Sequence, residues 1–360
     1  MLYQLSVIFV LAVAWILIAR RVALTVGLVD KPNARKQHLG HIPLVGGIAV
    51  YLTLMLMTLW QPAWLPDNTV YLLCITALVV LGVLDDRFDL PVAPRVMVQG
   101  GIALAMMLAA GMQLSSLGHA WGHQEVMLGY GALLLTPLAV WAAINAFNMV
   151  DGIDGLLGGL SCVSFGALGL LLYLSGHHEL AFWCFAMIAT IVPYILLNLG
   201  ILGRRYKVFM GDAGSTLIGF TAIWLLLQSS QGKAHSINPV TALWIIAIPL
   251  MDMIAIMYRR LRKGMSPFSP DRQHIHHLIM RAGFTPRQAF VLITLAAALL
   301  AAVGVIGERL TFIPEWVMLA LFLLAFFLYG YCIKRAWRVA RYIKRIKRRL
   351  RRSSDNKQVS

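Results

Sequence analysis

Two amides and two carboxylates interrupt a strongly apolar sequence in the stretch NAFNMVDGIDGL, residues 145–156. Asn145, Asn148 and Asp151 step by three, so a continuing helix would place them on one side, and Asp154 follows after a glycine. Carboxylate and amide oxygens suit a hard cation such as Mg²⁺, and the amides can also recognise a nucleobase. The stretch therefore favours a binding site at the end of an apolar segment over a simple helix stop.

A second acidic group ends another apolar run, in the stretch GVLDDRFDL, residues 82–90. Asp85 or Asp86 would share a helical face with Asp89. Three carboxylates at the C-terminal end of a helix repel one another and oppose the helix dipole, so they need a cation or a basic partner. A solvated helix end is the alternative, and we favour the interpretation as a metal and phosphate site.

Asp212 lies between two glycines in the stretch VFMGDAGS, before a further apolar run and after the basic residues of LGRRYK. Glycines allow a sharp turn, and the start of a helix attracts anions. Two interpretations stay open on these residues alone. Asp212 is either a metal ligand or an ordinary helix N-cap, a position where Asp is common.

Basic residues and histidines accumulate in two more stretches. DKPNARKQHLGHIPLVGG, residues 30–47, holds Lys36 and His38, and it is equally explained as a topogenic loop with a turn. RRLRKGMSPFSPDRQHIHH, residues 259–277, ends in three histidines. Their spacing suits zinc, but the neighbouring groups are basic and no cysteine accompanies them. We therefore favour contact with phosphate or sugar.

The elements that position these residues follow from composition. The chain of 360 residues is 59% hydrophobic and 13% charged, with a mean hydropathy of +0.76, which excludes a soluble globular protein. We predict an all-α, polytopic integral membrane protein with one continuous membrane domain, residues 1–335, and a basic tail, residues 336–360. The eleven expected spans are roughly 2–19, 43–61, 68–84, 95–113, 127–147, 156–175, 179–200, 213–229, 238–257, 288–306 and 314–334.

The basic residues predict the orientation of these spans. All Lys and Arg residues except Lys233 and Arg309 fall on one set of loops and on the tail. The positive-inside rule then places the N-terminus in the periplasm and the C-terminus in the cytoplasm. Most aspartates share the cytoplasmic side, which favours a site for phosphates and a metal. In the tail, an apolar stripe that includes Ile343 and Ile346 predicts a surface helix on anionic lipid.

Four motifs in order, LDDRFD, NAFNMVDGIDGL, VFMGDAGS and SPDRQHIHH, carry a resemblance to a known family. Over roughly residues 20 to 350, the chain resembles the polyprenyl-phosphate N-acetylhexosamine-1-phosphate transferases. The HIHH form is similar to the N-acetylglucosamine branch, whereas the muramoyl-pentapeptide relatives carry three adjacent histidines.

The resemblance implies a reaction and its participants. N-acetylglucosamine 1-phosphate would pass from UDP-N-acetylglucosamine to undecaprenyl phosphate, with release of UMP, on the cytoplasmic side of the bacterial inner membrane. It implies Mg²⁺ or Mn²⁺ as cofactor and a product that starts O-antigen and enterobacterial common antigen chains. Anionic membrane lipids are a further expected partner, nucleic acid is not, and assembly into a homo-oligomer is left open.

The same interpretation sorts the candidate residues into three sets. Asp212, joined by Asn148, would hold the metal. Asp85 or Asp86 would orient or deprotonate the lipid phosphate, and Asp151 and Asp154 would hold the nucleotide, with no division between base and ligand. The expected catalytic residues are Asp85, Asp86, Asp151, Asp154 and His274. The expected substrate-binding residues are Lys36, His38, Asp89, Asn145, Arg260, Asp271, Arg272, His276 and His277.

Two other classes of protein compete with a transferase. A transporter places ionisable groups near the bilayer midplane and often has inverted repeats. Here the acids lie at the ends of the apolar runs and the two halves share no repeat. Asp252 is the exception within a span, about 10 Å from its basic end on helical rise. A membrane scaffold would explain the spans but not the four polar motifs.

Overall fold

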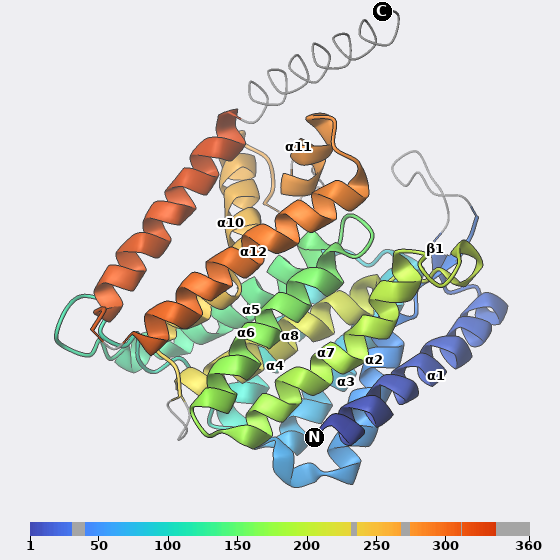
Figure 1. Cartoon of the computed structure of the whole chain (residues 1–360), viewed down its shortest axis with the longest axis horizontal. Helices are drawn as coiled ribbons and strands as arrows, with labels where there is room; N and C mark the ends of the chain where they lie inside the picture. Colours follow the sequence, from blue (N-terminus) through green and yellow to red (C-terminus); the bar gives the residue numbers. More distant parts are fainter. Residues whose placement is uncertain (31–39, 232–235, 268–273, 311, 336–360) are drawn as a thin grey trace, which may run out of the picture.

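The computed structural model describes residues 1–30, 40–231, 236–267, 274–310 and 312–335. Within these residues the fold is almost entirely helical, which confirms the all-α prediction (Figure 1). Strands β1 (Val29–Asp30) and β2 (Ile42–Pro43) form one small antiparallel pair. The basic tail, residues 336–360, lies outside the described residues, so its surface helix stays a prediction.

The helices follow the apolar runs of the sequence closely. Short 3₁₀ turns, η1 (Pro62–Trp64), η2 (Gly129–Gly131) and η3 (Arg204–Tyr206), connect some of them. The α-helices are α1 (Leu2–Val26), α2 (Gly46–Trp60), α3 (Asn68–Phe88), α4 (Val92–Ala109), α5 (Ala132–Val150), α6 (Leu156–Leu174), α7 (His178–Asn198), α8 (Gly211–Ser230), α9 (Pro239–Ile245), α10 (Ala247–Arg262), α11 (Ile275–Arg281), α12 (Pro286–Arg309) and the last helix, Glu315–Arg335.

Nine described helices are long and apolar enough to cross a membrane, and the bent pair α9 and α10 makes a tenth span. Each of the eleven expected spans coincides with helix, but two differ from a straight crossing. The expected span 238–257 bends by 82° between α9 and α10. Pro249 explains the bend, because it cannot donate to the carbonyl of Ile245 and its ring crowds that group.

The other exception is the expected span 43–61, which contains only the 15 residues of α2. Ile42 and Pro43 form strand β2 rather than helix, and the backbone N–H groups of Val45 and Gly46, at the start of α2, donate to the Phe209 carbonyl at 3.1 and 2.9 Å. At the other end, Pro62 follows the helix and opens η1. The two prolines inside α5 and α7, in contrast, leave those helices continuous.

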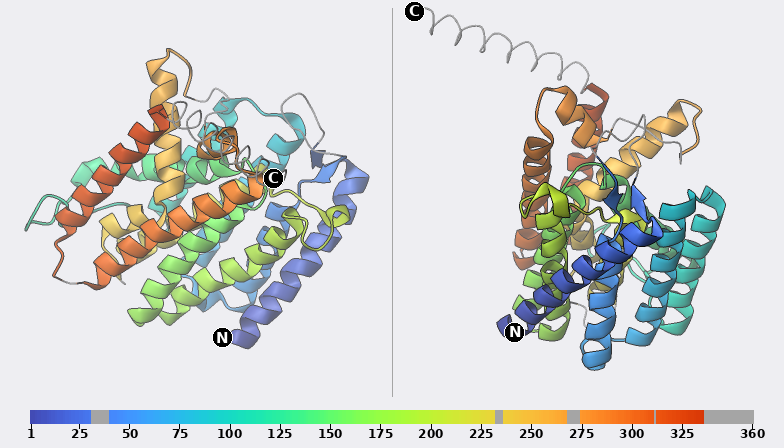
Figure 2. Two further views of the ribbon diagram at one scale, coloured as in Figure 1. Left: turned by 45° about the horizontal axis from the view of Figure 1, so that its top comes forward. Right: turned by 90° about the vertical axis from the view of Figure 1, so that its right-hand side faces the viewer.

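Helix α8 forms the centre of the bundle. In its most apolar window 94% of the residues are buried, against 28% for α12 and 11% for the last helix. Helices α2, α3 and α5 pack around it, and α1 and the last helix lie at opposite edges of the bundle (Figures 1 and 2). The start of α8 is therefore surrounded by protein on several sides, which suits a site.

Backbone contact between helices brings this centre together. A Cβ on Gly82 of α3 would lie 2.3 Å from the backbone of Ala213 in α8, and a Cβ on Gly47 of α2 would lie 2.1 Å from the backbone of Gly214. Only glycine allows such close approach. The start of α1 and the end of the last helix lie at opposite ends of the bundle (Figure 1).

Substitution of Gly82 tests this packing. The methyl group of Gly82→Ala meets backbone that cannot move aside easily, so we expect a loss of about 1–3 kcal/mol in the free energy of unfolding. The measurement is the thermal midpoint of the purified protein in detergent. Gly101→Ala in α4 is the matched control, since a Cβ there meets nothing within 4 Å. A midpoint lowered equally by both changes would contradict the close contact of α3 with α8.

Candidate active site

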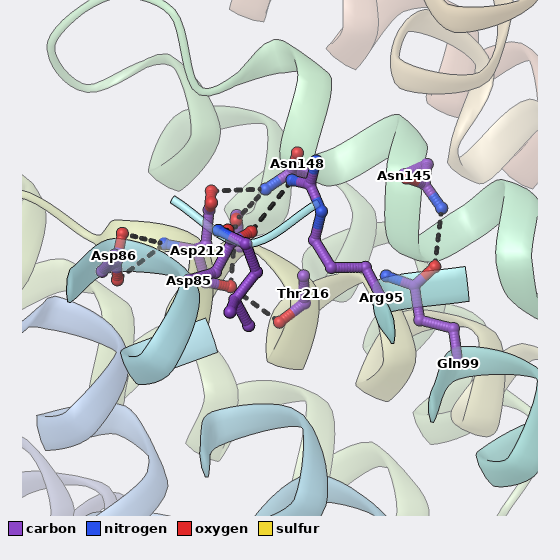
Figure 3. Close-up of polar contacts among 10 residues, drawn as sticks. Asp85, Asp86, Arg95, Gln99, Asn145, Asn148, Asp212 and Thr216 are labelled. Atoms are coloured by element: carbon purple, nitrogen blue, oxygen red, sulfur yellow. Dashed lines mark hydrogen bonds and ion pairs between the residues drawn. The ribbon is translucent and has the colours of Figure 1, made fainter. Parts of the chain in front are cut away.

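The ends of three helices converge around Asp212 (Figure 3). Asp85 and Asp86 lie in the last turn of α3, Asn148 in the last turn of α5, and Asp212 in the first turn of α8. Asn148 donates through Nδ2 to Asp212 Oδ1 at 2.8 Å and to Ser215 Oγ at 2.8 Å. Three motifs that are distant in sequence thus meet in one hydrogen-bonded group.

Asp86 satisfies the start of α8. Both of its carboxylate oxygens accept the backbone N–H of Asp212, each at 3.0 Å. Gly211 has a φ of 74°, and a Cβ there would lie 2.4 Å from Asp86 Oδ2. The interpretation of Asp212 as an N-cap is therefore wrong. Met210 holds the N-cap position, and the Asp212 carboxylate accepts from Asn148.

Asp85 has a different set of partners from its neighbour. Its side chain is buried, Oδ2 accepts from Arg95 Nη1 at 2.9 Å, and Oδ1 accepts from the backbone N–H of Leu90 at 2.8 Å. Asp89 is exposed and ends α3 as its C-cap with a φ of 52°, a conformation that Asp tolerates. The local turn thus explains Asp89 by itself, and its role toward a substrate stays a prediction.

Two cavities open on either side of Asp212 and Asn148. One, the polar cleft, has a volume of about 450 Å³. The other, the inner cavity, has a volume of about 160 Å³ and is reached between α3, α4, α5 and α10. Asp212 and Asn148 line both cavities and form the wall between them. The polar cleft is also lined by Asp86, Asp151, Asp154, Asn198 and Lys207. The inner cavity is also lined by Asp85, Arg95, Gln99, Asn145, Met257 and Arg260.

The polar cleft carries an excess of negative charge. Asp154 pairs with Lys207 Nζ at 2.6 Å, whereas Asp151 opens to the cleft. The protein atoms that displace bulk water around Asp151 and the like charges of Asp212 and Asp154 together raise the pKa of this carboxyl to about 7. A bound cation would offset the repulsion among these carboxylates. The donor set is oxygen-only, as Mg²⁺ prefers.

The site offers few protein ligands to a cation and leaves room for water and substrate phosphate. Within the described part of the chain, no group of three His, Cys, Asp or Glu side chains forms a ready-made metal site. Mg²⁺ does not require one, because it keeps several waters and binds through one or two carboxylates plus substrate phosphate. Asp212 is the carboxylate shared by both cavities. Asn148 uses its amide nitrogen for Asp212 and Ser215, so Oδ1 is the atom that can join a cation.

Asn198 at the end of α7 holds two loops of the polar cleft together. Its Oδ1 accepts from the backbone N–H of Gly155 at 2.6 Å, and its Nδ2 donates to the Val208 carbonyl at 2.9 Å. A side-chain amide carries both an acceptor oxygen and a donor nitrogen, so it can make both bonds. The loop of residues 151–155 is thereby fixed against the strand-like stretch that leads into α8.

The histidine motif reaches the same loop from α11. The rings of His274 and His276 stack with centroids 5.6 Å apart and planes within 4°. A Cβ on Gly152 would lie 2.3 Å from the His276 ring, so the ring packs directly on the 151–155 loop. Burial, and then the neighbouring imidazoles of His277 and His274, lower the pKa of His276 to about 3, which keeps this imidazole neutral.

The remaining expected residues divide between described and undescribed parts of the chain. Asn145 donates to Gln99 Oε1 at 3.0 Å and faces the inner cavity, as does the buried Arg260, which donates to the Pro267 carbonyl. His277 packs on His276 with ring centroids 4.2 Å apart. Lys36, His38, Asp271 and Arg272 lie outside the described residues.

Comparison with known proteins identifies relatives of this chain. The glycosyl transferase family 4 model matches residues 68–230, which hold three of the four motifs. The undecaprenyl-phosphate alpha-N-acetylglucosaminyl 1-phosphate transferase of Yersinia pestis is 72% identical, over 99% of this chain and 98% of the relative. Proteins with the same name in Salmonella typhimurium and Escherichia coli K12 are 67% and 68% identical. Those matches cover 99% and 96% of this chain, and 97% and 94% of the two relatives.

The chain belongs to this transferase family. It is a glycosyl-1-phosphate transferase, and the scaffold and transporter classes no longer compete. The structure also brings to the motifs three residues that the motifs did not single out. These residues, which form hydrogen bonds with motif residues, are Arg95, Asn198 and Asp252. In the sequence, their one distinguishing feature is a polar side chain close to or inside an apolar run.

Asp212→Asn separates charge from shape at the wall between the cavities. Asn can still accept from Asn148, and the start of α8 is satisfied by Asp86, so we expect the protein to stay folded. The lost negative charge weakens attraction for a cation, so turnover should fall by at least about a hundredfold, beyond the range for residues that only support metal ligands. Turnover and size-exclusion profile are the measurements. Near-normal turnover with an unchanged Mg²⁺ requirement would contradict a ligand role.

Proposed function

We propose that this enzyme transfers N-acetylglucosamine 1-phosphate from UDP-N-acetylglucosamine to undecaprenyl phosphate and releases UMP. The names of its relatives, at up to 72% identity over nearly the whole chain, support these substrates. The observation that carries the proposal is the wall of Asp212 and Asn148 between two chemically different cavities. Two cavities that meet at one wall can hold a water-soluble nucleotide and a lipid phosphate side by side.

The polar cleft suits the nucleotide sugar. It is open and lined by polar and charged groups, among them Lys207 and the backbone of the 151–155 loop. A larger basic pocket of about 970 Å³ continues from it through Asp154 and Lys207 and is lined by Arg204, Arg205 and others. Cations beside the cleft offset the charge of a diphosphate. We assign the donor to this side.

The inner cavity suits the lipid phosphate. Apolar side chains of α3, α4 and α10, such as Leu81, Val96 and Met257, line it together with Arg95 and Asp85. The mixed lining matches a phosphate on a hydrocarbon chain, because the arginine can neutralise the phosphate while the tail stays in apolar surroundings. We assign the acceptor to this side.

The two adjacent aspartates take different parts in this scheme. Asp85 lines the inner cavity and Asp86 lines the polar cleft, where both of its oxygens hold the start of α8. Asp85 is therefore the acid that orients the acceptor phosphate. Such a phosphate has a second pKa near 6 and is mostly ionised at pH 7, so a strong base is not required.

Transfer then needs positioning and charge neutralisation more than proton abstraction. An oxygen of the acceptor phosphate forms a bond to the β-phosphorus of the donor. The bond from that phosphorus to the bridging oxygen breaks, and UMP leaves with the electron pair. Mg²⁺, or Mn²⁺, held by Asp212 with Asn148, would supply positive charge to the diphosphate oxygens. His274 would contact the diphosphate from the α11 side.

The setting of the reaction is also part of the proposal. Basic loops at the end of the bundle that carries the site support a cytoplasmic active site in a bacterial inner membrane. We propose that the product starts O-antigen and enterobacterial common antigen chains. Contact of the basic tail with anionic lipid and assembly into a homo-oligomer stay predictions from the sequence.

Release of UMP tests the function directly. Purified enzyme should release UMP from UDP-N-acetylglucosamine only when both undecaprenyl phosphate and Mg²⁺ are present. A panel of UDP-sugars in the same assay defines the sugar preference. UMP release that does not depend on the lipid phosphate, or its complete absence with all donors, would overturn the proposal.

The assignment of the two cavities predicts that substitutions in each cavity raise the KM of a different substrate. Arg95→Gln should raise the KM for undecaprenyl phosphate by about ten- to hundredfold, which is the loss of affinity expected when one charge-assisted hydrogen bond is removed. The donor KM should change little. Lys207→Gln should do the reverse. Arg309→Gln, exposed at the far end of α12, is the control. If both variants raise the KM of the same substrate, the two-cavity assignment is wrong.

A further inference from the structure

A buried carboxylate lies outside both cavities. Asp252 in α10 is completely buried, yet α10 is the second half of a bent, apolar span. An ionisable group in such surroundings is costly unless it is paired and hydrogen-bonded. Neither the cation site nor either substrate cavity includes it, so its retention needs another explanation.

Three donors from two other elements converge on this carboxylate. His274 Nδ1 lies 2.7 Å from Oδ2, the backbone N–H of Ile275 donates to Oδ1 at 3.1 Å, and the Tyr329 hydroxyl donates to Oδ1 at 2.7 Å. His274 and Ile275 begin α11, and Tyr329 belongs to the last helix. One side chain thus ties the histidine motif to two helices of the bundle.

The pairing fixes the chemistry of His274. A carboxylate has no proton to donate, so His274 must carry its proton on Nδ1 to make this bond. The other ring nitrogen, Nε2, is then the one that can face a substrate. A hydrogen bond at Nδ1 also fixes the plane of the ring, and with it the plane of the stacked His276.

The chain of contacts ends at the polar cleft. His276 packs on Gly152, and the neighbours of Gly152, Asp151 and Ile153, line the cleft. A rotation of the His274 ring would therefore displace the loop that faces the nucleotide. Capping of α11 explains only the bond from Ile275, and it does not require the bonds from His274 and Tyr329.

We propose that Asp252 is a positioning residue that acts through His274, with Tyr329 holding the carboxylate in place. It fixes the tautomer and orientation of His274 for the donor diphosphate. The inference rests on the proposed function, because it concerns the same reaction. It adds a helix pair, α10 and the last helix, to the machinery that positions the histidine motif.

A double-mutant cycle tests the inference. Asp252→Asn places an amide N–H opposite His274 Nδ1, favours the other tautomer and should lower kcat by about ten- to hundredfold. His274→Gln should lower kcat at least as much. If Asp252 acts through His274, the double variant should lie within about threefold of His274→Gln alone. The KM for undecaprenyl phosphate should stay within about threefold throughout, because the histidines do not line the inner cavity.

Three further variants distinguish the inference from a general folding defect. Tyr329→Phe removes one hydroxyl and keeps the other two bonds, so it should lower kcat by a smaller factor, and only when His274 is present. Asp67→Asn, exposed at the opposite end of α3, should leave kcat unchanged. Tyr331→Phe, exposed on the last helix, is the control for the tyrosine.

The outcomes separate the inference from the function. Losses from Asp252→Asn and His274→Gln that multiply in the double variant, or a Tyr329→Phe loss that persists without His274, would overturn the inference while the wild-type enzyme still releases UMP. A rise of the acceptor KM together with a fall in kcat would show general loosening and overturn it as well. If the wild-type enzyme itself releases no UMP, the proposed function fails, and this inference fails with it.

Discussion

The contact between the Asp86 carboxylate and the start of α8 is the interaction on which the site depends. Helix α8 is the most buried helix of the bundle, and its first N–H groups form the positive end of its dipole. A carboxylate from the end of α3 satisfies the N–H of Asp212 with both oxygens. Because Asp86 takes this structural part, the Asp212 side chain is free to point toward Asn148 and the wall between the two cavities.

The acidic side chains of the site differ in whether a basic side chain pairs with them. Asp85 and Asp154 each have a basic partner, Arg95 and Lys207, on opposite sides of that wall. Among the described residues, no basic side chain forms an ion pair with Asp212 or Asp151, and both carboxylates line the polar cleft. In the proposed reaction a divalent cation and an anionic substrate would meet there. In the proposed reaction two anionic substrates meet, so cations must neutralise part of their charge, and a bound divalent cation would add to the positive charge of Arg95 and Lys207.

Much of the fold could be predicted from the sequence, because apolar runs of membrane length determine where helices form. The bend between α9 and α10 could not, although Pro249 marked its place, since proline is tolerated in α5 and α7. The motif acids were recognisable as a group, but their individual roles depend on tertiary contacts. Asp86 caps a helix 126 residues away, and Asn198 joins two loops, and neither pairing leaves a local pattern.

An experimental structure of the enzyme with Mg²⁺, UMP and undecaprenyl phosphate is the most direct test of the central claim. The account predicts an ion bonded to the Asp212 carboxylate, the nucleotide in the polar cleft and the lipid phosphate beside Arg95 in the inner cavity. An ion that does not contact Asp212, or a nucleotide and a lipid phosphate on the same side of the wall formed by Asp212 and Asn148, would contradict it.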